Sequence, residues 1–92
     1  MQEKVGIGLK YKIVIKKPAM KFIDKLPINE KGRIVAAIER LPYGEDIKPL
    51  KGHVGLMRLR IGTYRIIYTV DNNELIVMVI DAGNRGQIYN RY

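Results

Sequence analysis

The stretch LMRLRIGTYRIIYTVDNNELIVMVID, residues 56–81, decides the fold. Apolar side chains recur along it at every second position, which is typical of β-strands with two unlike faces. Gly62 interrupts the alternation once and the Asp-Asn-Asn run at 71–73 interrupts it again, and both consist of residues that favour tight turns. The stretch therefore predicts an antiparallel meander of three strands, at residues 56–61, 63–70 and 74–81.

Upstream of the meander, the sequence predicts one strand and two short helices. Residues 9–16 alternate between apolar side chains and lysines, except at Val14, as expected for a strand with one solvated face. Residues 18–26 and 29–41 carry apolar side chains at helical spacing, and a proline follows each of them. Asn29 is a suitable N-cap for the second helix. We therefore expect an αα-hairpin before the meander.

The remaining segments complete one domain. Residues 42–55 are rich in Pro, Gly and charge and are expected to form a loop from the helices to the sheet. Residues 82–89 contain a glycine-rich bend and are expected to add a short last strand. The expected fold is α+β: an N-terminal strand, a two-helix hairpin, and a three- to four-stranded antiparallel meander packed on the helices. The 92 residues fit a single domain, 1–92, with 1–8 expected to be flexible.

The charge of the chain favours a polyanionic partner. The formal net charge is +8 and the sequence pI is about 9.9, which suits nucleic acid, a ribosome or an acidic protein. Residues 1–48 carry nine Lys and two Arg, whereas residues 49–92 carry five Arg and one Lys. Because the planar fork of arginine matches phosphate, the second half is the expected contact half.

Composition also excludes several classes of site. The chain has no cysteine, which excludes disulfides and cysteine-based metal sites or nucleophiles. The only histidine, His53, cannot form a His–His acid/base pair, and no metal-ligand cluster surrounds it, so we expect neither a metal nor another cofactor. No apolar run approaches the roughly 20 residues that span a bilayer or resembles a signal peptide, so a cytoplasmic protein without membrane association is expected.

Three arginines of the meander are predicted to share one face of the sheet. Arg58 and Arg60 alternate with apolar residues, and Arg65 lies on the next strand. If Gly62 is the second residue of a two-residue turn, Arg58 lies opposite Arg65; if Gly62 is the first, Arg60 lies there instead. Like charges across a sheet are destabilising, so the trio needs acidic partners or an anionic ligand. Asp81 alternates toward the core side, which favours an external anion over acidic partners; a solvated sheet face is the alternative.

Three segments together resemble the RelE/ParE toxin superfamily. They are LKG at 50–52, MRLRIGTYRIIY at 57–68 and AGNRGQIY at 82–89. The G-x-Y-R-hydrophobic-hydrophobic-Y pattern, combined with a terminal G-x-R…Y, carries the resemblance, and the strand and helical hairpin before it fit the same fold. The resemblance covers nearly the whole chain after about Leu9.

For the RelE branch, the resemblance implies the toxin of a type II toxin–antitoxin system. Such a toxin is a ribosome-dependent endoribonuclease that cuts messenger RNA in the ribosomal decoding site and so inhibits translation. A RelB-like antitoxin wraps and neutralises it in a toxin–antitoxin hetero-oligomer. The implied chemistry is attack of an RNA 2′-hydroxyl on the adjacent phosphate, without a metal.

Residue roles carry over at the matching positions. The implied catalytic residues are Arg58, Arg65, Arg85 and Tyr89. Lys51 and Arg60 are implied to bind RNA. Arginines suit the crowded oxyanion, and dense positive charge favours the ionised form of a phenol, so Tyr89 is the implied base or 2′-hydroxyl orienter. Arg85 is the implied stabiliser or proton donor, and one lysine of the family pattern falls on Leu56 here.

Two alternatives stay open on the same fold. One is a ParE-like toxin that poisons DNA gyrase without cutting RNA. The other is a catalytically inactive relative whose basic face binds an acidic partner, and the leucine at position 56 keeps this alternative open. The terminal pair of Arg85 and Tyr89 favours RNA cleavage.

Overall fold

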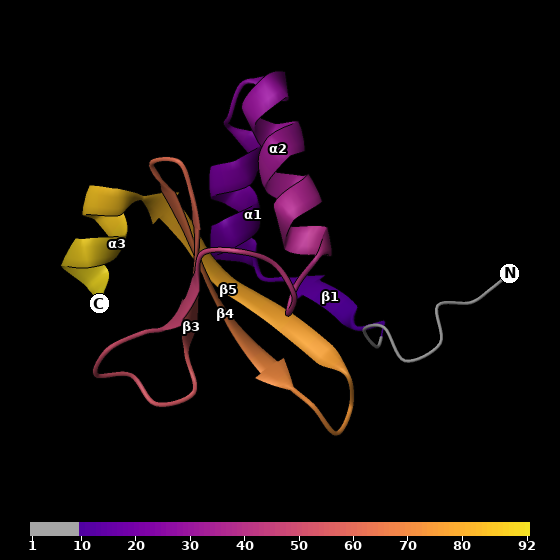
Figure 1. The fold of residues 1–92 in the computed structure, drawn as a ribbon. Coiled ribbons are helices and arrows are strands. Elements are labelled where there is room, and N and C mark those ends of the chain that lie inside the picture. Colours follow the sequence, from indigo (N-terminus) through magenta and orange to yellow (C-terminus); the bar gives the residue numbers. More distant parts are fainter. Residues whose placement is uncertain (1–9) are drawn as a thin grey trace, which may run out of the picture.

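The alternating stretch at residues 56–81 forms three consecutive antiparallel strands in the computed structural model, which describes residues 10–92. The expected flexibility of residues 1–8 lies outside the described part. The three strands are β3 (Met57–Ile61), β4 (Tyr64–Asp71) and β5 (Ile76–Asn84). Two shorter strands, β1 (Lys12–Ile15) and β2 (Ile47–Pro49), flank them. The result is a five-stranded sheet of order β1-β5-β4-β3-β2 (Figure 1).

The two edge strands reach the sheet in different ways. β1 runs parallel to β5, with Ile13 opposite Val77. β2 runs antiparallel to β3 and lies within residues 42–55, the segment expected to be entirely loop. That expectation was wrong because β2 is only three residues long and ends in Pro49, which lacks a backbone N–H and is tolerated at a sheet edge.

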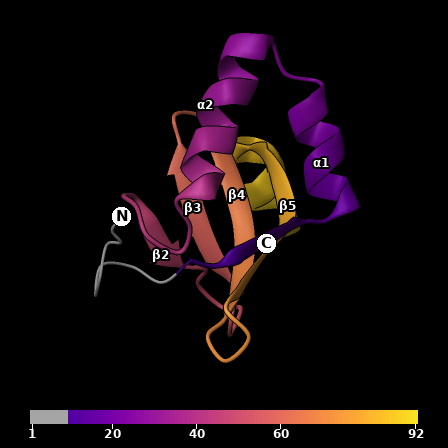
Figure 2. The same cartoon turned by 90° about the vertical axis from the view of Figure 1, so that its right-hand side faces the viewer.

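Both predicted helices are present and lie on the same face of the sheet (Figures 1 and 2). They are α1 (Lys17–Asp24) and α2 (Ile28–Glu39). The N-cap of α2 is Pro27, with φ −56° and extended ψ, and Asn29 lies inside the helix. The predicted cap was therefore wrong, because the helix starts directly after the proline that fixes its entry. No helix within residues 10–92 is long and apolar enough to cross a membrane.

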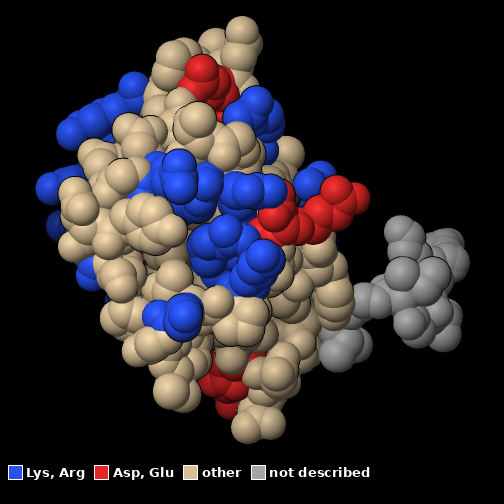
Figure 3. Space-filling model, turned by 60° about the vertical axis from the view of Figure 1, so that its left-hand side comes forward, with Lys and Arg blue, Asp and Glu red and all other residues tan. Residues whose placement is uncertain are grey.

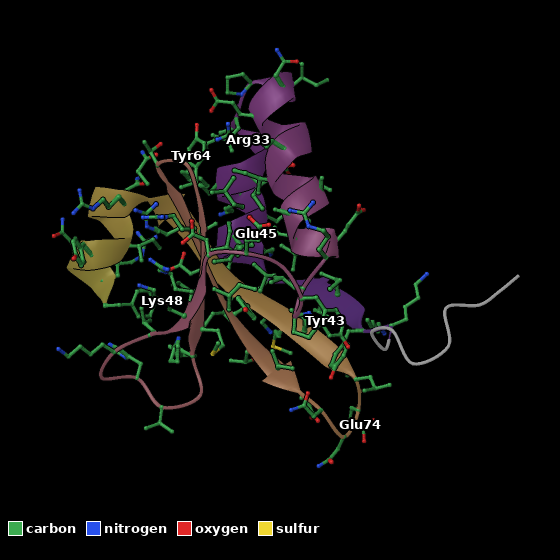
Figure 4. The ribbon with its side chains drawn as sticks, viewed as in Figure 1. Arg33, Tyr43, Glu45, Lys48, Tyr64 and Glu74 are labelled. Atoms are coloured by element: carbon green, nitrogen blue, oxygen red, sulfur yellow. The ribbon has the colours of Figure 1, made fainter. Side chains whose placement is uncertain are left out.

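The core lies between α1, α2 and the sheet face opposite to the arginines, as the alternation predicts. Its buried residues are Ala19, Ile23, Ile34, Ala37, Ile38, Leu41, Leu59, Ile66, Tyr68, Val77, Val79 and Ala82. Tyr64 lies beside this core. Its ring packs edge-to-face on Phe22, with centroids 5.8 Å apart, and its hydroxyl donates a hydrogen bond to Glu30 of α2, close to Arg33 (Figure 4). These contacts tie β4 to the helices.

A β-bulge in β5 changes which face its last residues occupy. Tyr68 pairs with Val79, whereas Ile67 pairs with Asp81, so one residue of β5 is left without a partner on β4. Because Ile67 also pairs with Arg58, Asp81 lies on the arginine-bearing face. The expectation that Asp81 points to the core side was wrong, since strict alternation stops at the bulge.

The chain ends in a helix, α3 (Arg85–Arg91), rather than in the expected last strand. Asn84 and Gln87 form a capping box in which the Asn84 backbone N–H donates to Gln87 Oε1 at 2.8 Å. This cap ends β5 and starts the helix. α3 contacts β4 and β5, and its Ile88 is buried. The helix thus covers part of the second apolar face of the sheet.

The turn between β3 and β4 fixes the register of the arginines. Gly62 and Thr63 form the turn, and Arg60 lies opposite Arg65, which is the second of the two registers that the sequence allows. Gly62 adopts φ +58°, in the left-handed region that L-residues with a side chain rarely enter.

Substituting Gly62 with alanine is expected to lower the free energy of unfolding by about 1–2 kcal/mol, because Ala is strained at a positive φ. The matched control is Gly32→Ala, inside α2, where an added Cβ meets nothing within 4 Å. That change should raise the free energy of unfolding by about 0.5–1 kcal/mol. Urea denaturation at constant m-value measures both, and equal midpoints for the two variants would contradict the turn assignment.

Candidate functional site

A cleft of about 690 Å³ lies between α3 and the arginine-bearing face of the sheet. Its lining residues are Leu50, Lys51, Arg58, Arg60, Arg65, Arg85, Ile88, Tyr89 and Tyr92. All six residues that the sequence nominated for catalysis or RNA binding are among them. On the side of the molecule that carries α3, basic side chains gather in the middle of the face, with a smaller acidic group at their border (Figure 3).

Three cleft residues were not nominated from the sequence: Leu50, Ile88 and Tyr92. A signal for two of them exists, because Arg85, Ile88 and Tyr92 are spaced three and four residues apart, as on one face of a helix. The expectation of a strand at 82–89 concealed that spacing. Leu50 precedes Lys51 in the loop after β2, and nothing in the local pattern marks it.

Arg58 is more enclosed than Arg60, with 20% of its side chain accessible against 48%. Its Nε and Nη2 atoms are buried and make no hydrogen bond to the described residues. The nearest acidic atom, Asp46 Oδ1, lies 4.0 Å from Nη2. Buried donors without acceptors are costly, so Arg58 is poised to gain from an anion in the cleft.

Arg60, by contrast, has an acidic partner within the fold. Asp46 Oδ2 accepts a hydrogen bond from Arg60 Nε at 3.0 Å and forms an ion pair with Arg60 Nη2 at 2.9 Å. This corrects the inference that only an external anion balances the arginines. Asp46 was missed because it lies before β2, and only the pairing of β2 with β3 brings it beside Arg60.

Arg65 lies where several cations converge. Its Nη1 donates to the carbonyl oxygens of Gly62 at 2.9 Å and Tyr64 at 3.0 Å, which fixes the guanidinium above the turn. Burial lowers the pKa of Arg65, and the charges of Arg58, Arg60 and Arg85 lower it further, while Asp46 raises it. Repulsion of this kind is relieved when an anion enters the cleft.

The first turn of α3 supplies the other side of the cleft. The Arg85 backbone N–H donates to the Thr63 carbonyl at 2.9 Å, which joins α3 to the β3–β4 turn. The Arg85 guanidinium carbon lies 5.5 Å from the centre of the Tyr89 ring, a cation–π distance. Tyr89 is 72% exposed, and within the described residues its hydroxyl has no hydrogen-bond partner. It is therefore free to meet a ligand.

Asp81 anchors the end of α3. It is 8% exposed, and its carboxylate accepts hydrogen bonds from Arg91 Nε at 2.9 Å, Arg91 Nη2 at 3.1 Å, the Tyr92 hydroxyl at 3.1 Å and the Ala82 N–H at 2.9 Å. Burial raises the pKa of Tyr92, and the Asp81 charge raises it further. His53 Nε2 lies 3.2 Å from the main-chain oxygen of Tyr92, so His53 supports the helix from outside the cleft lining.

Cationic side chains dominate the lining of the cleft. Five cationic side chains and no Asp or Glu side chain line it, and among residues 10–92 no group of three His, Asp or Glu side chains could hold a metal ion. The expectation of a site without metal or cofactor stays a prediction. Guanidinium groups supply both positive charge and directed N–H donors, which is what a phosphate or an oxyanion requires.

Fold and cleft together define a small α+β protein with an arginine-lined cleft opposite its helical hairpin. Residues 13–89 match the sequence model of a family described as the ParE toxin of the type II toxin–antitoxin system parDE. The match extends over most of the chain, which therefore belongs to this family of toxins, within the RelE/ParE superfamily.

Individual relatives support this family assignment. The chain is 31% identical over 81 residues to toxin RelG of Mycobacterium tuberculosis, which covers 79% of this chain and 88% of that protein. The toxin–antitoxin complex RelBE2 of M. tuberculosis contains a chain with a TM-score of 0.70 and 26% identity, covering 84% of this chain and all of that one. The RelB–RelE complex of Methanococcus jannaschii contains a chain with a TM-score of 0.69 and 26% identity, covering 86% of this chain and 98% of that one.

Proposed function

We propose that this toxin is a ribosome-dependent endoribonuclease that cuts messenger RNA in the decoding site and so inhibits translation. The observation that carries the proposal is the convergence of Arg58, Arg65 and Arg85 with Tyr89 on one cleft. These residues come from β3, β4 and α3, and no local motif would bring them together. The ribosome as target places the proposed action in the cytoplasm.

The proposed reaction is a transesterification. The 2′-oxygen forms a bond to the adjacent phosphorus and the bond from phosphorus to the 5′-oxygen breaks, which gives a 2′,3′-cyclic phosphate and a 5′-hydroxyl. Tyr89 orients the 2′-hydroxyl or accepts its proton, and Arg85 stabilises the phosphorane or supplies a proton to the departing 5′-oxygen. Arg58 and Arg65 stabilise the negative charge that develops on the non-bridging oxygens, and that stabilisation is commonly the largest catalytic contribution.

Neighbouring residues complete the proposed site. Lys51 lies at the cleft on the loop after β2, where its exposed ammonium suits an adjoining phosphate of the strand. Leu56, at the position of a family lysine, is only partly buried and contributes no charge. Arg58, two residues further along, lines the cleft and supplies a cation in this region instead.

The proposed protein partner is an acidic, RelB-like antitoxin in a toxin–antitoxin hetero-oligomer. Support comes from the relatives, because the M. tuberculosis and M. jannaschii structures are toxin–antitoxin complexes. The surface chemistry agrees, since a chain of net charge +8 with an arginine-lined cleft suits an acidic segment laid over it.

A second candidate has a specific observation in its favour. The family model that matches residues 13–89 is that of ParE toxins, which favours poisoning of DNA gyrase on the same fold. The inactive relative, which only binds an acidic partner, is the third. These candidates differ in what happens to messenger RNA, so the test follows transcripts directly.

The wild-type chain and the Arg85→Ala/Tyr89→Phe double variant are expressed from a tightly controlled promoter, and 5′ ends of cellular transcripts are mapped over the first minutes. We expect new 5′ ends at in-frame positions within translated regions, absent from the double variant. Growth arrest with intact transcripts and induced DNA-damage signalling would shift the assignment to gyrase poisoning. Normal growth would indicate the inactive relative.

A further inference from the structure

The arginines of β3 are not equivalent, although the sequence gives them the same alternation. Arg60 already donates from Nε to Asp46 and holds Nη2 in an ion pair with it, whereas the same two atoms of Arg58 are buried and without an acceptor among the described residues. A guanidinium that is already paired with a carboxylate gains less from a phosphate than an unpaired one does. One whose donors are desolvated and unused gains the most.

Asp46 is held in place by more than its ion pair with Arg60. The Arg60 backbone N–H donates to the Asp46 carbonyl at 3.1 Å, so the two residues are joined through main chain and side chain. Asp46 also adopts φ +63°, a left-handed conformation that is uncommon outside glycine. An isolated exposed ion pair contributes little, but here the backbone contact fixes both partners.

The ion pair also offsets the repulsion between like charges on the sheet. Arg60 lies directly opposite Arg65, a like-charge pair that pushes the two guanidinium groups apart. Asp46 neutralises Arg60 at 2.9 Å and lies 4.0 Å from Arg58. With Arg60 balanced, Arg58 and Arg65 can stay close to each other and face the cleft.

We propose that Asp46 and Arg60 form a strut that orients Arg58 and Arg65 for the scissile phosphate, and that Arg60 itself contacts no phosphate. Both are positioning residues. This replaces the RNA-binding role implied for Arg60 by the resemblance, and it rests on the proposed nuclease function.

The test separates contact from positioning by measuring binding and cleavage independently. The full chain binds a single-stranded RNA with 2′-O-methyl riboses, which cannot be cleaved, and its affinity is followed by fluorescence anisotropy against salt concentration. Each phosphate contact on single-stranded RNA contributes about 0.7 to the slope of log affinity on log salt. We expect the slope of log affinity on log salt to be smaller by about 0.7 in Arg58→Gln and unchanged from the wild type in Arg60→Gln.

Cleavage in a translating extract at saturating toxin gives the second readout. Asp46→Asn and Arg60→Gln should each slow cleavage about 10-fold. The double variant should be no slower than either single variant, because each single change already removes the strut. The matched control is Glu45→Gln, the same charge change at a neighbouring exposed acid (Figure 4) that forms no ion pair among residues 10–92. It should cleave at the wild-type rate. Denaturation midpoints confirm that every variant is folded.

Each other outcome overturns the strut. A slope reduced by about 0.7 in Arg60→Gln would make Arg60 a phosphate ligand. Tighter RNA binding and faster cleavage by Asp46→Asn would make Asp46 a competing anion, and wild-type behaviour of Asp46→Asn would make the pair a passive surface contact. If the wild type binds RNA but cuts nothing, the nuclease function fails, while the slopes still decide whether Arg60 contacts phosphate.

Discussion

Tyr89→Phe is expected to slow cleavage of ribosome-bound messenger RNA at least about 100-fold without changing the fold. The substitution removes only the hydroxyl, which is the group proposed to orient or deprotonate the 2′-hydroxyl. The ring under the Arg85 guanidinium is kept. Because Tyr89 is 72% exposed and its hydroxyl has no partner among residues 10–92, the free energy of unfolding should stay within about 0.5 kcal/mol.

Single-turnover cleavage of messenger RNA in purified ribosomes measures the effect. The matched control is Tyr43→Phe, which removes the same group from another exposed tyrosine, outside the cleft. Its cleavage rate should equal that of the wild type. If Tyr89→Phe also cleaves at the wild-type rate, the Tyr89 hydroxyl has no part in the reaction, and Arg85 remains as the contribution of α3.

The alternation at residues 56–81 predicted the three central strands and the shared face of the arginines, because side-chain direction in a strand depends only on local period. It could not choose the register, since a single glycine fits either position of a two-residue turn. The structure places Gly62 first, and its positive φ is the reason that glycine is required there.

The features that the sequence did not reveal all depend on contacts between distant segments. The bulge that turns Asp81 toward α3 is fixed by pairing with Ile67, not by local pattern. Asp46 reaches Arg60 only through the β2–β3 pairing, and residues 82–89 read equally well as a strand until the capping box of Asn84 and Gln87 is known. Local period therefore predicted the shared face of Arg58, Arg60 and Arg65, whereas Lys51, Arg85 and Tyr89 were nominated by the family resemblance alone. Long-range pairing decides how these residues are held.

The positions of Arg85 and Tyr89 depend on how firmly the far end of α3 is attached. A seven-residue helix is too short to be stable alone, so its contacts with the sheet must hold it. At one end, the Arg85 N–H bonds to Thr63, and at the other, Arg91 and Tyr92 bond to the buried Asp81 carboxylate. The Asp81 carboxylate thus accepts hydrogen bonds from two side chains at the end of the helix.

Asp81→Asn is therefore expected to detach the end of α3 and to slow cleavage at least about 10-fold through Arg85 and Tyr89, which Asp81 does not touch. Loss of the charge-assisted bonds should lower the free energy of unfolding by about 1.5–3 kcal/mol. Hydrogen exchange separates the local effect from the global one: amides of residues 85–92 should exchange faster than those of β5. The matched control is Asp24→Asn, whose partner Lys31 lies 3.0 Å away on the surface, and it should change stability by about 0.5 kcal/mol or less. Full retention of α3 protection and of cleavage in Asp81→Asn would mean that the packing of Ile88, rather than the carboxylate, positions the helix.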